Sequence, residues 1–268
     1  MKISIVTPSF NQGAFIAEAI ESVLAQHYAN VEHIILDNCS TDETAKVLAR
    51  YPHLKVICEK DKGQSDALNK GFKAATGDIV GWLNADDKYL PGCFDHSLEA
   101  FAKHSEFDLV YGDYRLVDAK GCLIRVRKEL GFDPFMLKYL HVLYIPTTTT
   151  FFRRKIFDER NFIDINYHYS MDYEYFLRLA ERGYRFGHIP AVMADFRWHA
   201  DAKSQQIIKA QAEMERALLA HDQFLRQFNS SMRIPIRNIL MFLARLKRYV
   251  LKVLLGAYFV KGSDRLGT

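Results

Sequence analysis

Short apolar runs alternate with helical patterns along the first 83 residues, and this alternation limits the possible folds more than any other feature. Apolar runs predict strands at residues 2–7, 31–36, 54–58 and 79–83. Helical spacing predicts helices at residues 13–24, up to 49, and at 65–75. Strands joined by helices of about a dozen residues indicate an α/β fold with a mainly parallel sheet and right-handed crossovers.

The alternation loosens in the second half of the chain. We predict strands at residues 108–118, 147–152, 184–189 and 192–198, with a hairpin around 119–121 after the first of them. Helical patterns predict helices at residues 91–104, 171–182 and 203–228. We expect one α/β domain followed by a helical tail.

Composition narrows the class of protein. With 49% hydrophobic and 25% charged residues among 268, the chain is typical of a globular protein. Four scattered cysteines without C-x-x-C spacing argue against a structural zinc site and favour free thiols in a reducing compartment. The N-terminus lacks the apolar core of a secretory signal, so we expect a cytoplasmic location.

Basic residues concentrate in the tail. Between residues 223 and 263 there are eight Lys or Arg and no Asp or Glu, although the net charge of the whole chain is only +4. The rest of the chain is therefore net acidic, which argues against a general nucleic-acid-binding surface. From residue 236 onward apolar residues follow helical spacing. The pattern predicts an amphipathic basic helix, attached either to anionic lipid or to the protein's own domain or a partner subunit.

Polar and acidic loops follow the first four predicted strands. They lie at residues 7–11, 37–42, 61–66 and 84–87. Because the carboxyl ends of parallel strands meet at one edge of a sheet, we expect these loops to form one pocket for a polar ligand. Asp86 and Asp87 are adjacent carboxylates, which suit a divalent cation, although solvated turns and helix caps also contain Asp. No G-x-G-x-x-G or G-x-x-x-x-G-K-[ST] loop is present, so dinucleotide and ATP sites of those kinds are excluded.

Several ordered motifs together resemble family 2 glycosyltransferases of GT-A fold. They are Thr-Pro-Ser-Phe-Asn at residues 7–11, Asp-Asn-Cys-Ser-Thr-Asp at 37–42, Gly-Gln-Ser-Asp-Ala-Leu-Asn-Lys-Gly at 63–71, Trp-Leu-Asn-Ala-Asp-Asp at 82–87, Phe-Phe-Arg-Arg at 151–154, Met-Asp-Tyr-Glu-Tyr-Phe-Leu-Arg at 171–178 and Phe-Arg-Trp-His at 196–199. The resemblance implies a GT-A (Rossmann-like) catalytic domain over residues 1–205. Its nucleotide-sugar half covers about 1–115 and its acceptor half about 116–205. Residues 206–268 form the helical tail.

The resemblance also implies roles for individual residues on the donor side. Residues expected to line the nucleotide pocket are Thr7, Pro8 and Asn11. Asp37 would contact the base or ribose, although Asn38 follows it where the family has a second acid. Asp61 or Lys62 would face a uracil-like edge. Residues that could contact the donor sugar are Gln64, Ser65 and Asp66, with the N-cap of the following helix as the alternative for Ser65.

For the diphosphate, the resemblance implies a site for Mn²⁺ or Mg²⁺. Asp86 would bind the ion, with Asn84, Ala85 and Asp87 as neighbours and Asp87 as a second candidate ligand. Asn84 stands where the motif usually begins with an acid, which leaves the number of carboxylate ligands open. His199 would complete the metal shell, or is a surface or packing residue.

Two charged residues remain open to more than one role. Arg197 would pair with the diphosphate, or form a salt bridge with Asp195 or Asp201. Asp172 occupies the family's position for the general base that deprotonates the acceptor hydroxyl. Its alternative role is that of a first-turn acid favoured by the helix dipole.

The resemblance therefore implies an inverting glycosyltransferase that transfers a sugar from a nucleotide-diphospho-sugar, expected to be UDP-linked, to a surface glycan or a lipid-linked saccharide. The alternatives are a sugar nucleotidyltransferase and a noncatalytic nucleotide-sugar-binding protein at the membrane. The basic tail predicts peripheral association with the inner face of the plasma membrane.

Overall fold

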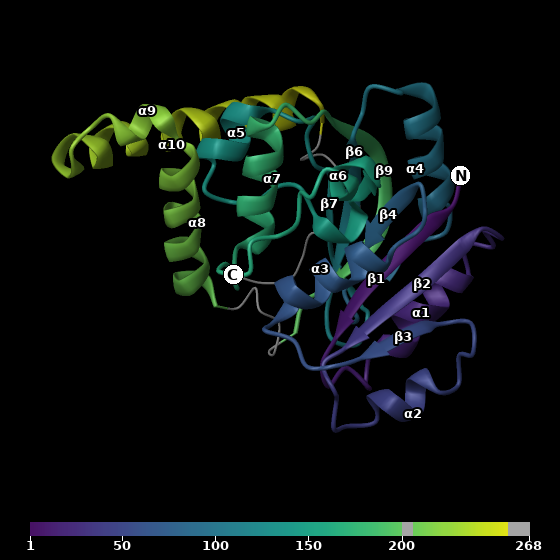
Figure 1. Cartoon of the computed structure of the whole chain (residues 1–268). Coiled ribbons are helices and arrows are strands. Elements are labelled where there is room, and N and C mark those ends of the chain that lie inside the picture. Colours follow the sequence, from purple (N-terminus) through teal and green to yellow (C-terminus); the bar gives the residue numbers. More distant parts are fainter. Residues whose placement is uncertain (200–205, 257–268) are drawn as a thin grey trace.

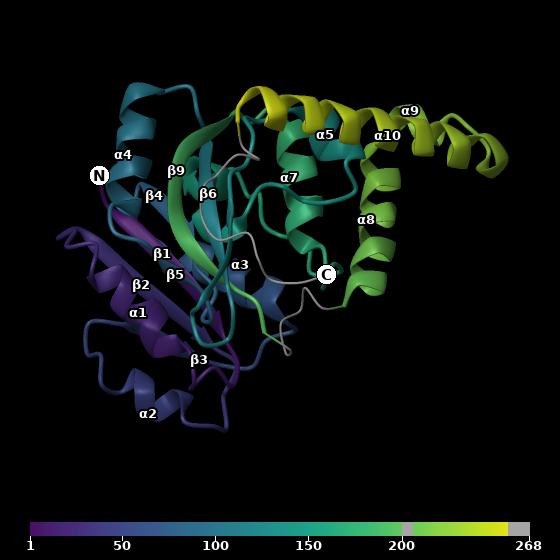
Figure 2. The ribbon, with the colours of Figure 1, turned by 180° about the vertical axis from the view of Figure 1, so that it is seen from behind.

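The computed structural model describes residues 1–199 and 206–256, which form a mixed sheet with helices on both of its faces (Figures 1 and 2). The strands are β1 (Ile3–Ser9), β2 (Val31–Asp37), β3 (Lys55–Cys58), β4 (Ile79–Trp82), β5 (Lys88–Tyr89), β6 (Leu109–Val117), β7 (Leu123–Arg127), β8 (Phe151–Arg153) and β9 (Phe186–Arg197). Their order is β3-β2-β1-β4-β8-β6-β9-β5, and β7 pairs with β6. Strands β3, β2, β1, β4, β6 and β9 share one direction, so their carboxyl ends lie at one edge.

Helices cover the two faces of this sheet. They are α1 (Ile16–Leu24), α2 (Thr44–Leu48), α3 (Gln64–Ala74), α4 (Cys93–Lys103), α5 (Pro134–Tyr139), the 3₁₀ turn η1 (Thr147–Thr149), α6 (Lys155–Asp158), α7 (Met171–Glu181), α8 (Ile207–His221), α9 (Gln223–Arg226) and α10 (Ser230–Leu254). In both ribbon views α7 lies between α8 and the sheet, and α10 crosses one end of α7 and α8.

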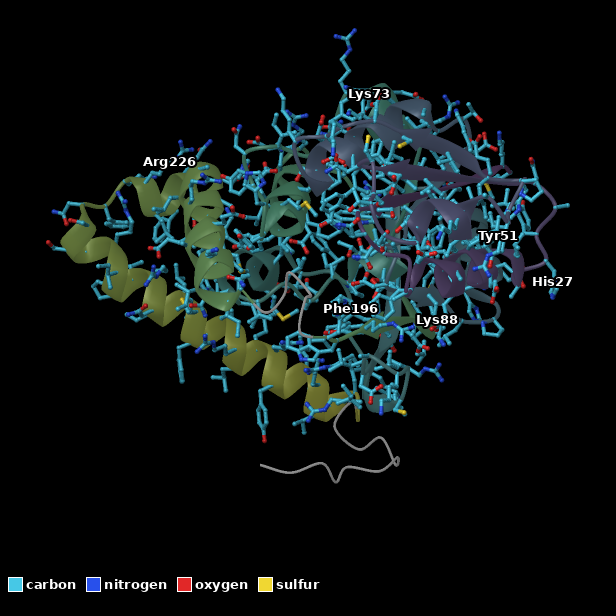
Figure 3. All side chains as sticks on the ribbon, turned by 90° about the horizontal axis from the view of Figure 1, so that it is seen from below. His27, Tyr51, Lys73, Lys88, Phe196 and Arg226 are labelled. Carbon is cyan, nitrogen blue, oxygen red and sulfur yellow. The ribbon has the colours of Figure 1, made fainter. Side chains whose placement is uncertain are left out.

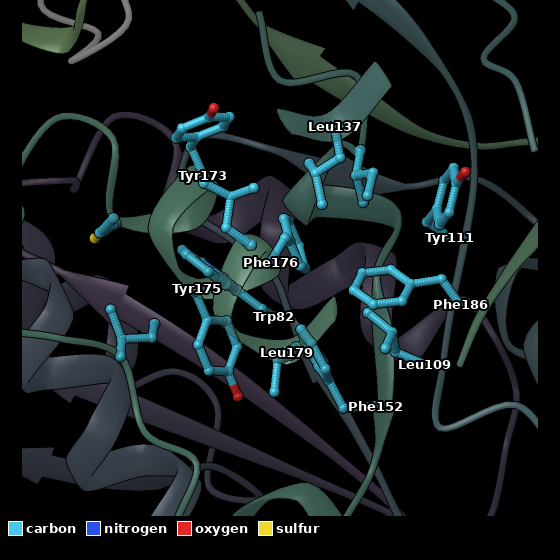
Figure 4. Close-up of a cluster of buried hydrophobic side chains, with 14 of the residues drawn as sticks. Trp82, Leu109, Tyr111, Leu137, Phe152, Tyr173, Tyr175, Phe176, Leu179 and Phe186 are labelled. Carbon is cyan, nitrogen blue, oxygen red and sulfur yellow. The ribbon is translucent and has the colours of Figure 1, made fainter. Parts of the chain in front are cut away.

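Neighbouring strand residues point to opposite faces, and each face has its own apolar core. Ile5 belongs to the cluster that α1 and α4 complete, whereas Val6 belongs to the cluster on the α3 and α7 side. Phe151 and Phe152 divide between the two clusters in the same way. The larger cluster, centred on the aromatic residues of α7, is shown in Figure 4. This double burial explains why the strand sequences are apolar at consecutive positions.

Residues 147–152 were expected to form a strand, and this expectation is wrong for the first half. Residues 147–149 form η1, and β8 begins only at Phe151. The Thr149 and Thr150 hydroxyls donate to the Pro146 carbonyl at 3.3 and 2.7 Å. Such local side-chain bonds offer the backbone an alternative to a strand ladder.

Residues 184–189 and 192–198 were expected to be two strands, but β9 is continuous. Its pairing with β6 passes from Gly112–Ile189 to Asp113–Val192 and so skips two residues, one of which is Pro190. A proline cannot donate to a ladder and is tolerated at such an irregularity. The apparent break in the sequence is therefore a bulge within one strand.

The expected helix at residues 203–228 is divided. Within its described part, α8 ends at His221 and α9 begins at Gln223, while residues 203–205 lie outside the described ranges. Asp222 stands at the break, where its carboxylate accepts hydrogen bonds from the backbone N–H of Phe224 and Leu225. A side chain that caps a new helix favours ending the previous one.

The expected amphipathic helix of the tail is α10, and it packs on the domain. Ile236, Leu240 and Leu251 contact the larger apolar cluster, and Ala244 is fully buried. Within residues 1–199 and 206–256, no helix is long and apolar enough to cross a membrane.

Candidate functional site

A cavity of about 420 Å³ opens at the edge where the parallel strands end. Its lining includes Pro8 near the end of β1, Asn38 after β2, and residues 84–87 in the turn after β4. Arg197 at the end of β9 and His199 just after it also line the cavity. The lining also includes His168, Tyr169, Met171 and Asp172, at the start of α7 and in the loop before it. The structure thus brings together strand ends and a helix start, as the polar loops predict.

Asp86 and His199 face each other across the acidic end of the cavity. His199 Nε2 lies 3.0 Å from Asp86 Oδ2, and their side chains are 8% and 22% exposed respectively. The His199 ring also stacks at an angle on Phe15, with ring centroids 5.1 Å apart. A carboxylate oxygen and an imidazole nitrogen thus point to the same place from two segments 113 residues apart.

Asp87 points in the other direction, into the protein. Its carboxylate is buried and accepts hydrogen bonds from Thr148 Oγ1 at 2.6 Å, from the Arg197 backbone N–H at 2.8 Å and from Asn84 Nδ2 at 3.0 Å. Burial, and after it the neighbouring Asp86 charge, raises the pKa of Asp87 to about 8 against the effect of these bonds. The carboxylate therefore fixes the turn to η1 and to β9.

Asn84 connects the turn to Trp82 of β4 and to Gln64 of α3. Its Oδ1 accepts from Trp82 Nε1 and Gln64 Nε2, both at 2.9 Å, while its amide donates to Asp87. An aspartate at this position could not donate to Asp87 and would add a third carboxylate to the turn. The asparagine thus serves as a neutral link, and Ala85 beside it is buried in the cluster of α1 and α2.

Arg197 is 2% exposed, and its guanidinium is engaged by the protein itself. Nε donates to the Asp86 carbonyl at 2.8 Å, Nη1 to the Ala119 carbonyl at 2.9 Å, and Nη2 to Glu18 at 2.8 Å. The predicted salt bridge with Asp195 is wrong, because Asp195 is held by Arg115, and Asp201 lies outside the described residues. Arg197 nevertheless lines the cavity, so its contact with a diphosphate stays a prediction.

The far end of the cavity has the polar groups expected of a base-binding region. Asn38 Oδ1 accepts from the Asp61 backbone N–H at 3.1 Å, and Asp61 Oδ1 accepts from Gly63 N–H at 2.7 Å. Both side chains line the cavity, together with Pro8 and Gln64. The predicted roles of Pro8, Asp61 and Gln64 therefore fit the geometry.

Six other residues assigned to the donor lie behind or beside this lining: Thr7, Asn11, Asp37, Lys62, Ser65 and Asp66. Thr7 is buried with its hydroxyl 2.9 Å from His33 Nε2, and the Asp37 carboxylate accepts from the Ser40 backbone N–H at 2.9 Å and from its hydroxyl at 2.5 Å. Ser65 donates to the Tyr167 carbonyl at 3.0 Å instead of capping its helix. These six side chains therefore lie outside the lining of the cavity.

Asp172 is half-buried in the first turn of α7 and lines the same cavity as the acidic turn. Hydrogen bonds to α8 hold the loop before Asp172. Glu213 of α8 accepts from the backbone N–H of His168 at 3.0 Å, Tyr169 at 2.7 Å and Ser170 at 2.9 Å. Ser170 in turn donates to the Ala210 carbonyl at 2.8 Å. These bonds connect the predicted catalytic domain with the predicted helical tail across the boundary at residue 205.

The side chains of Asp86 and His199 have the chemistry of ligands for a divalent ion. In the described part of the chain no group of three or more His, Cys, Asp or Glu side chains converges as a complete metal site. Asp86 and His199 nevertheless supply one oxygen and one nitrogen at a solvent-accessible cavity. An ion that bridges a substrate diphosphate commonly has only one or two protein ligands, since phosphate oxygens and water supply the rest.

Sequence reasoning missed several residues of the lining, among them Phe10, His168, Tyr169 and Phe196. Each of these residues lies within one of the quoted motifs or a few positions before one. Phe10 lies within residues 7–11, and His168 and Tyr169 precede Asp172 by a few positions. Proximity to a motif was therefore a usable signal. The role of Thr148 had no such signal, because it depends on a contact with Asp87 across 61 positions.

Solved structures with the same fold include two complexes with sugar nucleotides. The mannosyltransferase PcManGT from Pyrobaculum calidifontis, in complex with GDP-Man and Mn²⁺, aligns with a TM-score of 0.65 and 18% identity over 98% of this chain and 76% of that one. S. aureus TarS 1-349, in complex with UDP-GlcNAc, aligns with a TM-score of 0.62 and 16% identity over 87% of this chain and 69% of that one. These likenesses confirm the GT-A fold.

Relatives by sequence carry related names. An uncharacterized glycosyltransferase of Rickettsia typhi is 29% identical over 88% of this chain and 75% of its own length, and the chondroitin synthase of Escherichia coli is 26% identical over 79% and 31%. An uncharacterized glycosyltransferase of Rickettsia conorii is 33% identical over 54% of this chain, which spans only 24% of that relative's length. The family model of glycosyl transferase family 2 matches residues 4–160. More than half of the chain is covered, and the chain belongs to glycosyl transferase family 2.

Proposed function

We propose that this domain transfers a sugar from a nucleotide-diphospho-sugar to an acceptor hydroxyl in the synthesis of a surface polysaccharide or a lipid-linked saccharide. One observation carries the proposal: the Asp86–His199 pair and Asp172 line the same cavity. A diphosphate leaving group and an acceptor hydroxyl need these two kinds of group on opposite sides of the reacting carbon.

The donor would lie with its base near Asn38 and Asp61 and its diphosphate at Asp86. Asn38 offers both an amide donor and a carbonyl acceptor, which suits the edge of a uracil ring. The two solved complexes contain UDP-GlcNAc and GDP-Man, so the fold accommodates more than one base. We favour UDP for this chain because the polar groups near Asn38 and Asp61 are few, and few groups are enough to hydrogen-bond a small ring such as uracil.

Asp86 and His199 would hold Mn²⁺ or Mg²⁺, with Asp87 fixing the turn that presents Asp86. Asp87 was predicted as a further ligand. Its three hydrogen bonds support the role of an anchor in preference to direct coordination. The ion, when bound, offsets the negative charge that develops on the departing nucleoside diphosphate.

Asp172 would act as the general base of an inverting transfer. Its carboxylate takes the proton of the acceptor hydroxyl while the acceptor oxygen bonds to the anomeric carbon. The bond from that carbon to the diphosphate breaks at the same time, and the nucleoside diphosphate leaves with the electron pair. Attack from the side opposite the leaving group inverts the anomeric configuration. That Asp172 lines the same cavity as Asp86 supports this role.

The two alternatives are less well supported. A sugar nucleotidyltransferase needs a glycine-rich basic loop after the first strand, and residues 8–11 here are Pro-Ser-Phe-Asn. A noncatalytic binding protein would not need an acid on the acceptor wall. Family membership favours glycosyl transfer over both.

Titration of the full chain with UDP, GDP and dTDP, with and without Mn²⁺, tests the donor site. We expect one diphosphate to bind in a metal-dependent manner, and Asp86→Asn or His199→Ala to weaken that binding at least about tenfold. Matched controls are Asp158→Asn and His96→Ala, which alter exposed residues away from the cavity. Metal-independent binding, or binding that both variants retain, would overturn the proposed metal site. The absence of any diphosphate binding would overturn the function itself.

A further inference from the structure

The outer surface of α10 carries an apolar stripe that the domain leaves uncovered. Its members are Ile239, Phe242, Leu243, Leu246, Val250, Val253 and Leu254, and we call them the outer stripe. All are exposed, and the exposed fraction ranges from 38% for Val253 to 75% for Leu254, with 64% for Phe242. Their spacing of three and four places them along one side of the helix. In Figure 3 α10 forms the lower left margin of the molecule, and its side chains extend away from the domain.

The cations of the helix account for this orientation, because most of them face inward. Arg248 and Lys252 both pair with the buried Glu129, at 3.0 and 3.2 Å. Lys247 pairs with Asp133, and Arg237 pairs with Glu215 of α8. The sequence pattern left open whether this helix attaches to lipid or packs on the domain or a partner subunit. The ion pairs attach its basic face to the domain and turn the apolar stripe outward.

The edges of the outer stripe retain positive charge. Arg245 is exposed beside one edge, and Lys247, with 44% of its side chain exposed, lies beside the other. No acidic residue occurs between Ser230 and Leu254. A second copy packed on this stripe would bring like charges together with no carboxylate of the helix to compensate. An apolar stripe with cationic edges instead fits a lipid surface with anionic headgroups.

We propose that the outer stripe of α10 lies in the headgroup region of an anionic bilayer, with the helix parallel to the membrane plane. Phe242 and the aliphatic side chains enter the boundary of the acyl chains, and Arg245 reaches phosphate groups at one edge. Because α10 is fastened to α5 and α8, the domain is held at a fixed orientation to the bilayer. This inference does not depend on the reaction at the cavity.

Co-sedimentation of the full chain with vesicles tests the proposal. We expect binding to vesicles of equal parts phosphatidylglycerol and phosphatidylcholine, and at least tenfold weaker binding to phosphatidylcholine alone. The double variant Phe242→Ser/Leu246→Ser should lose at least tenfold in binding to the anionic vesicles. A matched control, Val56→Ser/Leu123→Ser, removes two apolar side chains of similar exposure far from α10 and should bind as the wild type does.

Further measurements separate lipid from other occupants. Arg245→Gln should weaken binding to anionic vesicles about fivefold and leave weak binding to neutral vesicles unchanged. All these residues are exposed, so the melting temperatures of the variants should match that of the wild type, and donor binding should be preserved. Failure of the wild type to bind anionic vesicles would overturn the proposal. So would a dimer in sedimentation velocity that Phe242→Ser/Leu246→Ser dissociates, since that result would assign the stripe to a second copy.

Discussion

The two walls of the cavity are built in different ways. The acidic turn at residues 84–87 is held by its own sheet, through bonds from Trp82, Thr148 and Arg197. The loop at residues 168–170 is held by α8, a helix that follows the sheet in sequence, through the Glu213 carboxylate and through the Ala210 carbonyl, which accepts from Ser170. The proposed donor wall, which contains residues 84–87, is thus fixed to the sheet. The proposed acceptor wall, which contains Asp172, depends on α8. A change in α8 should therefore affect the acceptor side without affecting donor binding.

The largest expected effect comes from the acceptor wall itself. Asp172→Asn should lower kcat by about 10²- to 10⁴-fold, because the amide cannot take the hydroxyl proton. The affinity for the nucleoside diphosphate should stay within about twofold of the wild type. Transfer to acceptor and calorimetric binding of the diphosphate measure the two quantities. Asp158→Asn is the control, and a variant at Asp172 with normal kcat would remove this residue from the mechanism.

A smaller effect should follow from loosening the loop. Glu213→Ala removes the acceptor of three backbone N–H groups and should lower kcat by about 10- to 100-fold, since small displacements of a catalytic group are costly. Glu213→Gln keeps one acceptor oxygen and should recover part of the rate. Diphosphate affinity should not change in either variant.

The control for Glu213 is Glu215→Gln, which lies on the same helix and pairs with Arg237. It should lower the melting temperature slightly and leave kcat as it is. If the two variants lower kcat equally, α8 contributes only general stability, and the contrast between the two walls is wrong.

The smallest expected effect concerns the donor wall, and it should be one of stability alone. Full burial of His33 in β2, beside β1, lowers its pKa to about 3. The unfolded chain takes up this proton below about pH 6.5, whereas the folded chain resists it until about pH 3. The unfolding free energy should therefore fall by up to about 1.4 kcal/mol per pH unit as the pH decreases from 6.5 towards 3.

The variant His33→Gln lacks this titration and can still bond to Thr7. Its stability relative to the wild type should rise by about that slope as the pH falls, which urea unfolding at several pH values measures. His96→Gln, at an exposed histidine, should show no such trend. A flat difference for His33→Gln would mean that the imidazole is hydrated in the folded protein.

The parallel half of the fold and its site were accessible from sequence because they depend on local patterns. Apolar runs, helical spacing and polar loops at strand ends were enough to place residues 84–87 beside residues 37–38 and 61–66. The identity of the ligand and the roles of single residues needed the family resemblance. Asp86, Asp172 and His199 were found in this way, and all three line the cavity.

What sequence could not supply are contacts between distant segments. The inward direction of Asp87 depends on Thr148 and on the backbone of Arg197, and the orientation of α10 depends on Glu129. A helical wheel separates apolar from basic positions but does not say which side a buried carboxylate will attract. The break at Asp222 likewise reflects a bond from the Tyr139 hydroxyl, 83 residues away.

Arg197 has a consequence for how the protein acquires its activity during folding. Its guanidinium joins Glu18, the Asp86 carbonyl and the Ala119 carbonyl, which are separated by up to 179 positions from it. Contacts of such sequence separation form late, because each requires a long loop to close. Of the described strands, β9 comes last in sequence, and it is the one that locks the acidic turn. A partly folded chain would have β1 to β4 in place and yet lack this lock, so the proposed diphosphate site should form only with the completed sheet.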